Sequence, residues 1–135
     1  MGLDVVAKGM PNYKLSYSTY GRFRAEIVRK VYGEKCYEMF TRNPFERRNM
    51  TQQEIMEEAK CWESVCSDDL DLFLLHSDCD GHFTPKECKT ILKALKPISI
   101  DFEGWDFDRN PCNMLDQWKR MFEHCVKRRV CMWYY

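Results

Sequence analysis

The segment 76–87 constrains this chain more than any other, because it places carboxylates at alternate positions next to a glycine. Asp78 and Asp80 are separated by one residue, Gly81 follows directly, and Glu87 closes the segment. Short acidic side chains at alternate positions of a tight loop point inward, and glycine allows the positive φ that lets the backbone wrap. The spacing therefore predicts a loop that can surround a hard cation such as calcium.

In its order of residues this segment resembles the calcium loop of the EF-hand superfamily, except that a histidine takes the place of the first aspartate. The resemblance implies one set of calcium ligands: His76, Asp78, Asp80, the His82 carbonyl, Thr84 and Glu87. A neutral imidazole nitrogen is a softer ligand than a carboxylate, so a zinc or copper site at His76 and His82 is the alternative. We expect calcium to be the preferred ion, bound with reduced affinity.

A second copy of the pattern extends over residues 106–117. The resemblance implies a weak second metal site there, with Asp106, Asp108, Asn110 and Cys112 as its candidate ligands. Pro111 stands where the loop glycine belongs, and Gln117 replaces the closing glutamate. Proline restricts φ and has no N–H group. We therefore expect this loop to be distorted and to bind calcium weakly or not at all.

A third copy, over residues 41–54, is recognisable only by its ending, Thr51 to Glu54. Arg42 and the nearby Arg48 argue against calcium in this segment, because cations in the loop repel the ion. Thr51 and Glu54 also have the spacing of a capping box at a helix start, which is the alternative interpretation of the same residues.

The three copies predict an all-α fold of EF-hand-like helix-loop-helix pairs, with a short β contact between loops 76–87 and 106–117. Residues 18–135 are expected to form one such domain, preceded by an N-terminal extension over residues 1–17. A helix is expected from 18 to 40. Calmodulin-like, sarcoplasmic and osteonectin-type calcium-binding modules are the members of the superfamily that the chain resembles. Apolar residues after each loop recur at helical spacing and predict buried helix faces: Cys88, Ile91, Leu92, Leu95, Trp118, Met121, Phe122 and Cys125.

Composition agrees with one globular unit and limits the choice of partner. Of 135 residues, 44% are hydrophobic and 14% aromatic, which is enough for a core. Lys plus Arg equals Asp plus Glu at 21 each, so net charge gives no reason to expect nucleic acid or an anionic membrane as partner. The basic segment 119–129 is read as a complement to a helix dipole. No stretch is long and apolar enough to predict a membrane span.

Eight cysteines form the second unusual feature: Cys36, Cys61, Cys66, Cys79, Cys88, Cys112, Cys125 and Cys131. An even number in a short chain favours disulfides and a secreted protein, although the connectivity cannot be read from the sequence. Reduced, half-buried thiols in a cytoplasmic protein are the alternative. The first residues do not have the pattern of a signal peptide, so a secreted form requires that a signal was removed.

Three functions remain open. The first is a calcium-binding regulatory module with one or two weakened sites. The second is a calcium-independent, disulfide-stabilised interaction protein with a protein partner, and the third is a binder of a small hydrophobic ligand. No phosphate-binding glycine loop, nucleophile elbow or zinc-protease motif is present, so we do not expect an enzyme.

Overall fold

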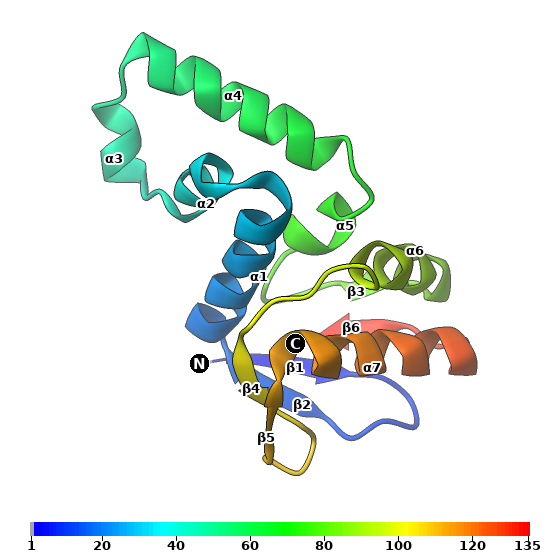
Figure 1. Ribbon diagram of the computed structural model, residues 1–135. Coiled ribbons are helices and arrows are strands. Elements are labelled where there is room, and N and C mark those ends of the chain that lie inside the picture. The colour runs from blue at the N-terminus through cyan, green and yellow to red at the C-terminus, as the bar shows by residue number, and fades with distance from the viewer. Residues whose placement is uncertain (1) are drawn as a thin grey trace.

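The structure is a computed structural model that describes residues 2–135, apart from the side chains of Pro44 and Arg47. It is a mixed α/β fold with 55% helix and 15% strand, so the expected all-α, EF-hand-like fold is wrong. In chain order the elements are β1 (Gly2–Val6), β2 (Tyr13–Ser16), α1 (Tyr17–Tyr32), α2 (Glu34–Thr41), α3 (Pro44–Arg48), α4 (Gln52–Cys66), α5 (Asp71–Leu74), β3 (His82–Phe83), α6 (Pro85–Leu95), β4 (Glu103–Trp105), β5 (Pro111–Asn113), α7 (Met114–Arg128) and β6 (Met132–Tyr134) (Figure 1).

A four-stranded antiparallel sheet with the order β2-β1-β6-β3 is the part of the fold that the helical prediction missed. Its first two strands come from the segment 1–17, which was expected to be an extension. In β1 and β2, buried and more accessible residues alternate, with Leu3 and Val5 buried on one strand and Tyr13 and Leu15 on the other. Period-two alternation of this kind is what a strand with one buried face requires.

The core lies between the inner face of this sheet and helices α1, α6 and α7 (Figure 1). At its centre the fully buried Trp118 stacks against Tyr20 and Phe23 and meets the edges of several other rings. The helix faces predicted after the two loops are confirmed, because all of their residues are buried in α6 and α7. The helix expected over 18–40 is found as α1 and α2, which are separated at Gly33 with φ of 95°.

The two loops that were expected to pair with each other have other partners. In the first loop, β3 pairs with β6, so that His82 faces Trp133 and Phe83 faces Met132. The second loop closes on itself as the hairpin β4–β5, with Trp105 opposite Pro111. The predicted β contact between the loops is therefore wrong. The physical reason is that residues 132–134 offer Phe83 a strand whose alternate side chains are buried, and the proline begins β5 instead of interrupting a calcium loop.

Helices α2, α3 and α4 form a helical arm, residues 34–66, that rises away from the sheet (Figure 1). Thr51 and Glu54 form a capping box at the start of α4, which confirms the alternative interpretation of that segment. Val65 is the one residue of α4 that is buried. Exposed apolar side chains lie on the arm at Phe45, Ile55 and Met56. No helix within residues 2–135 has the length and apolar character needed to cross a membrane.

Candidate functional site

In the first predicted metal loop, residues 76–87, His76 stands where the EF-hand pattern has an aspartate. Its side chain packs against other rings. The His76 ring lies against the rings of Phe83 and Tyr134, at centroid distances of 4.3 and 5.0 Å. Arg24 donates hydrogen bonds to the carbonyls of Leu74 and His76 at 3.0 and 2.7 Å. These contacts anchor the start of the loop to α1 and turn the imidazole toward the core.

The remaining predicted ligands of this loop do not converge. Asp78 is half-buried, whereas Asp80 is exposed. The Glu87 carboxylate accepts a hydrogen bond from the Thr84 backbone N–H at 3.0 Å, and the Thr84 hydroxyl accepts from the Glu87 N–H at 3.2 Å. Across residues 2–135, no group of three or more His, Cys, Asp or Glu side chains is placed to hold a metal ion. Calcium or zinc binding at this loop stays a prediction.

In the second predicted loop, the aspartate in the first position closes a turn. The Asp106 carboxylate accepts hydrogen bonds from the backbone N–H groups of Asp108 and Asn110, at 2.9 and 3.0 Å. Arg109 adopts φ of 66° between them. Cys112 lies further on, half-buried in β5. Because backbone donors already occupy this carboxylate, the turn is stable without an ion.

All eight cysteines are free thiols. Two pairs of these thiols nevertheless interact: Cys36 with Cys61 between α2 and α4, and Cys88 with Cys125 between α6 and α7. The neighbouring Cys125 thiol, together with burial, raises the pKa of the Cys88 thiol. Disulfide formation at these eight candidate cysteines stays a prediction. The fold identifies which of the thiols are neighbours.

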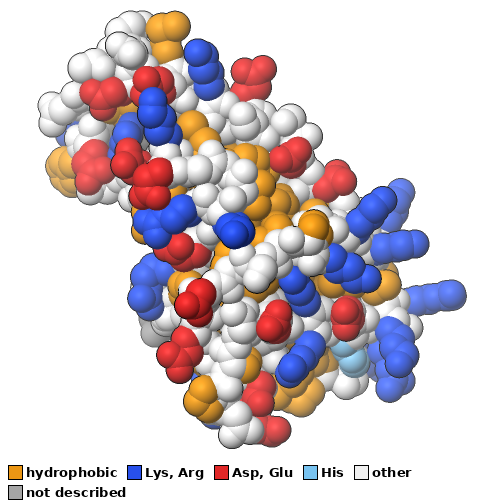
Figure 2. Space-filling view, in the orientation of Figure 1, with side chains coloured by type: hydrophobic (Ala, Val, Ile, Leu, Met, Phe, Trp, Pro, Cys, Tyr) orange, Lys and Arg blue, Asp and Glu red, His pale blue; other side chains and the backbone are white. Residues whose placement is uncertain are grey.

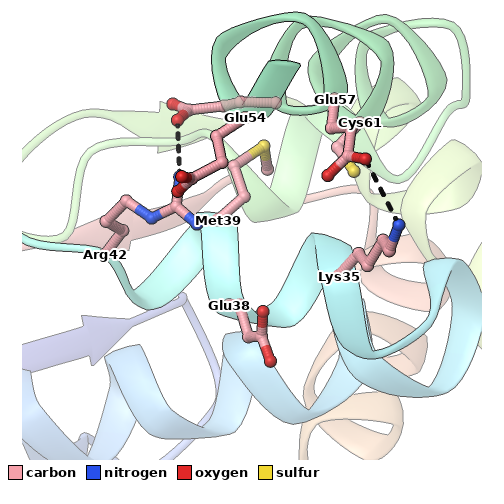
Figure 3. A pocket seen from close by; sticks show the side chains of 8 residues that line it. Lys35, Glu38, Met39, Arg42, Glu54, Glu57 and Cys61 are labelled. Carbon is pink, nitrogen blue, oxygen red and sulfur yellow. Dashed lines mark hydrogen bonds and ion pairs between the residues drawn. The ribbon is translucent and has the colours of Figure 1, made fainter. Parts of the chain in front are cut away.

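A charged hollow of about 150 Å³ lies between α2 and α4 (Figure 3). Its cations are paired, Lys35 with Glu57 at 3.5 Å and Arg42 with Glu58 at 3.3 Å. The Glu54 carboxylate is occupied by the capping box of α4. Two ion pairs in this hollow therefore join the α2 segment to α4.

The outer face of the sheet is the surface that the helices leave uncovered. Since Leu3, Tyr13 and Tyr134 point into the core, their neighbours along each strand point the other way. Trp133 and Tyr135 on and after β6 are consequently exposed, with 40% and 63% of their surface accessible. Large aromatic rings exposed on a sheet face are unusual enough to mark a candidate interaction surface.

Three aromatic rings form a continuous row on this face, here named the aromatic row: His82, Trp133 and Tyr135. His82 and Trp133 are opposite each other across β3 and β6 and stack with centroids 4.4 Å apart and planes at 25°. Trp133 and Tyr135 are two residues apart on one side of the strand and stack at 6.4 Å and 22°. The sheet register thus presents three nearly parallel rings in sequence.

Exposed cations follow β1 and precede β6, the two strands that pair at Val6 and Trp133. Lys8 follows β1, and its carbonyl accepts a hydrogen bond from His124 Nε2 at 2.9 Å, which ties this turn to α7. Lys127, Arg128 and Arg129 end α7 just before β6. The ion pairs among the described side chains involve Arg29, Lys35 and Arg42, and none involves these cations. Figure 2 shows Lys and Arg side chains gathered over α6 and the far end of α7.

An open hollow of about 550 Å³ lies at the opposite edge of the sheet, between strands β1–β2 and the hairpin β4–β5. Lys14 and Asp4 line it from the strands, and Trp105 and Arg109 line it from the hairpin. The Arg109 guanidinium lies over the Trp105 ring at 5.4 Å. This hollow therefore brings one ring, two cations and one carboxylate together at the β2 edge of the sheet.

Sequence reasoning missed the aromatic row. His82 was singled out only as a metal ligand, through its carbonyl for calcium or its imidazole for zinc or copper, and Trp133 and Tyr135 were not considered. The available signal was the alternation in residues 132–135, but a strand of three residues is too short for its buried face to be chosen from the sequence. Comparison of the chain with protein families, curated proteins and solved structures found no match.

Proposed function

We propose that this protein binds single-stranded nucleic acid, with unpaired bases stacking on the aromatic row. The observation that carries the proposal is the row itself: three exposed, nearly parallel rings on an uncovered antiparallel sheet. Every base has a flat π-face, and one base stacked on an aromatic side chain contributes about 1–3 kcal/mol. Sheets that expose aromatic rings bind two or three RNA bases in this way in other proteins.

We also propose that the exposed cations next to β1 and β6 contact the phosphates of the same strand. Lys8 and the segment 127–129 carry charges without ion-pair partners among the described side chains. The zero net charge had suggested no nucleic-acid partner, but net charge averages over the whole surface. Screening limits the reach of an exposed charge to about 8 Å at physiological salt, so the local arrangement of charges matters more than the net charge.

The first experiment measures fluorescence anisotropy of labelled oligonucleotides of roughly 12 nucleotides, single-stranded and duplex. Trp133→Ala and Tyr135→Ala should each weaken binding of the single strand about 5- to 150-fold, since each removes one stacking platform. Phe45→Ala is the matched control, because it removes a ring that is 74% exposed but lies on the helical arm. Its affinity should equal that of the unmodified protein.

Salt dependence tests the phosphate contacts separately. Arg129→Ala should reduce the slope of log affinity against log salt concentration by about 0.7, the value for one contact to a single strand. Lys60→Ala, an exposed cation on α4, should leave the slope unchanged. Equal binding by the Trp133 and Phe45 variants would refute the proposal. A dimer in light scattering that Trp133→Ala converts to monomer would show instead that a second copy covers the row.

A further inference from the structure

Two thiols meet where the helical arm joins the rest of the molecule. Cys36 lies on the inner face of α2, one turn from the buried Met39, and only 5% of it is exposed. Cys61 lies on the inner face of α4, one turn before the buried Val65, and is half-buried. The ion pair between Lys35 and Glu57, at 3.5 Å, joins the same turns of α2 and α4, and across this seam the Cys36 and Cys61 thiols interact. Helix periodicity puts each thiol on the same face of its helix as the buried residue one turn away.

The seam contains few buried residues of α4, so a covalent link there would matter. Val65 is the buried residue that α4 contributes to the core, and ion pairs at Lys35 and Arg42 also join α4 to the α2 segment. Cys61 lines the charged hollow of Figure 3, which opens one of the two sulfur atoms to solvent. The geometry offers an accessible sulfur with a buried partner beside it.

We propose that Cys36 and Cys61 form a dithiol site that a small disulfide, such as glutathione disulfide, oxidises to a bond locking α4 onto α2. Cys61 attacks first because it is accessible: its thiolate displaces one glutathione and forms a mixed disulfide. The Cys36 sulfur then attacks Cys61 and displaces the second glutathione. Two protein thiols become one disulfide, the reagent's disulfide becomes two thiols, and the two protons end on the released glutathione.

The order of these steps agrees with the surroundings of the two sulfurs. Burial, together with the Cys61 thiol, raises the pKa of Cys36 to about 12, so Cys36 is a poor first nucleophile. Cys88 and Cys125 also meet, but both are fully buried between α6 and α7, where a peptide disulfide has no access. Cys66 and Cys79 are exposed and should simply accept one glutathione each.

The test treats the native protein with glutathione disulfide, alkylates the remaining thiols and maps tryptic peptides by mass spectrometry. We expect fragmentation to show Cys36 linked to Cys61 in the tryptic peptide 61–86, which also carries Cys66 and Cys79; the link itself removes two hydrogen atoms. Amide hydrogen exchange in α4 should slow roughly tenfold or more on oxidation, since the link removes open states of the arm. Cys66→Ser, on the same helix, should change neither result.

Cys61→Ser is the decisive variant, and its half-buried position makes it tolerable if Cys36→Ser fails to fold. In that variant the link should be lost, and exchange in α4 should no longer respond to the oxidant. Glutathione on Cys66 with Cys36 and Cys61 both still alkylated would overturn the proposal. A link that forms only in denaturant, or a Cys36 that links elsewhere in native protein, would overturn it as well. None of these readouts depends on nucleic acid binding.

Discussion

The hydrogen bond between the hydroxyls of Tyr20 and Tyr134 should make this fold sensitive to alkaline pH. The two oxygen atoms are 2.6 Å apart, and both side chains are buried. Burial is the main reason that the pKa of Tyr20 rises to about 12, partly opposed by the Arg24 guanidinium over its ring. Burial and the neighbouring Tyr20 raise the pKa of Tyr134 as well. The native state therefore holds these protons more tightly than the unfolded chain, in which tyrosine titrates near its ordinary pKa of about 10.

The sign and size of the effect follow from this difference. A raised native pKa stabilises the fold fully below about pH 10, and this stabilisation is lost as the pH rises through about 12. For Tyr20 the difference is about two pKa units at about 1.4 kcal/mol each, or about 3 kcal/mol. In that interval the free energy of unfolding should fall by about 1.4 kcal/mol per pH unit for each tyrosine that only the unfolded state ionises.

The assay is urea unfolding followed by circular dichroism, from about pH 8 to about pH 11. The double variant Tyr20→Phe/Tyr134→Phe should lose less stability over this range than the unmodified protein. Tyr134→Phe alone should cost about 1–3 kcal/mol at pH 8, because it leaves the Tyr20 hydroxyl buried without its partner. Tyr13 and Tyr32, whose pKa values are also raised by burial, are present in both proteins, so the comparison isolates the pair. Parallel loss of stability in both proteins would refute the reasoning.

Three further changes probe other parts of the fold. Gln117→Leu should raise the free energy of unfolding by about 1–2 kcal/mol, because the amide is buried with no hydrogen-bond partner among the described groups; a decrease in urea unfolding would contradict this. Thr84→Ala should destabilise by about 1 kcal/mol through loss of the α6 capping box, and unchanged thermal unfolding would show that the cap is unimportant. If the predicted calcium loop is functional, Asp78→Asn with Asp80→Asn should abolish the heat of calcium binding to chelator-stripped protein; unchanged affinity would exclude these ligands.

The helices were largely predictable because their signals are local. The apolar faces of α6 and α7 follow from a period of 3.6 residues, and the capping box at Thr84 and Glu87 is visible within four residues. The same residues misled the reading of function. A threonine and a glutamate three residues apart satisfy both a helix cap and the end of a calcium loop, and the sequence does not say which role each carboxylate takes.

Pairing between distant segments was beyond local patterns. Val6 lies opposite Trp133, and His82 lies opposite the same residue from the other side, so the sheet joins the beginning, middle and end of the described chain. A three-residue strand has no periodicity that identifies its partner or its buried face. The aromatic row and the cations near Lys8 exist only because these pairings form.

By itself, the sequence determined where helices begin, which of their faces are apolar and which loops contain turns, since these depend on neighbours within one or two helical turns. The tertiary structure alone decided that Tyr134 is buried while Trp133 is exposed, and that Cys36 meets Cys61. Burial and proximity depend on which surfaces the whole chain brings together, because the free energy of removing apolar area from water is shared among segments far apart in sequence.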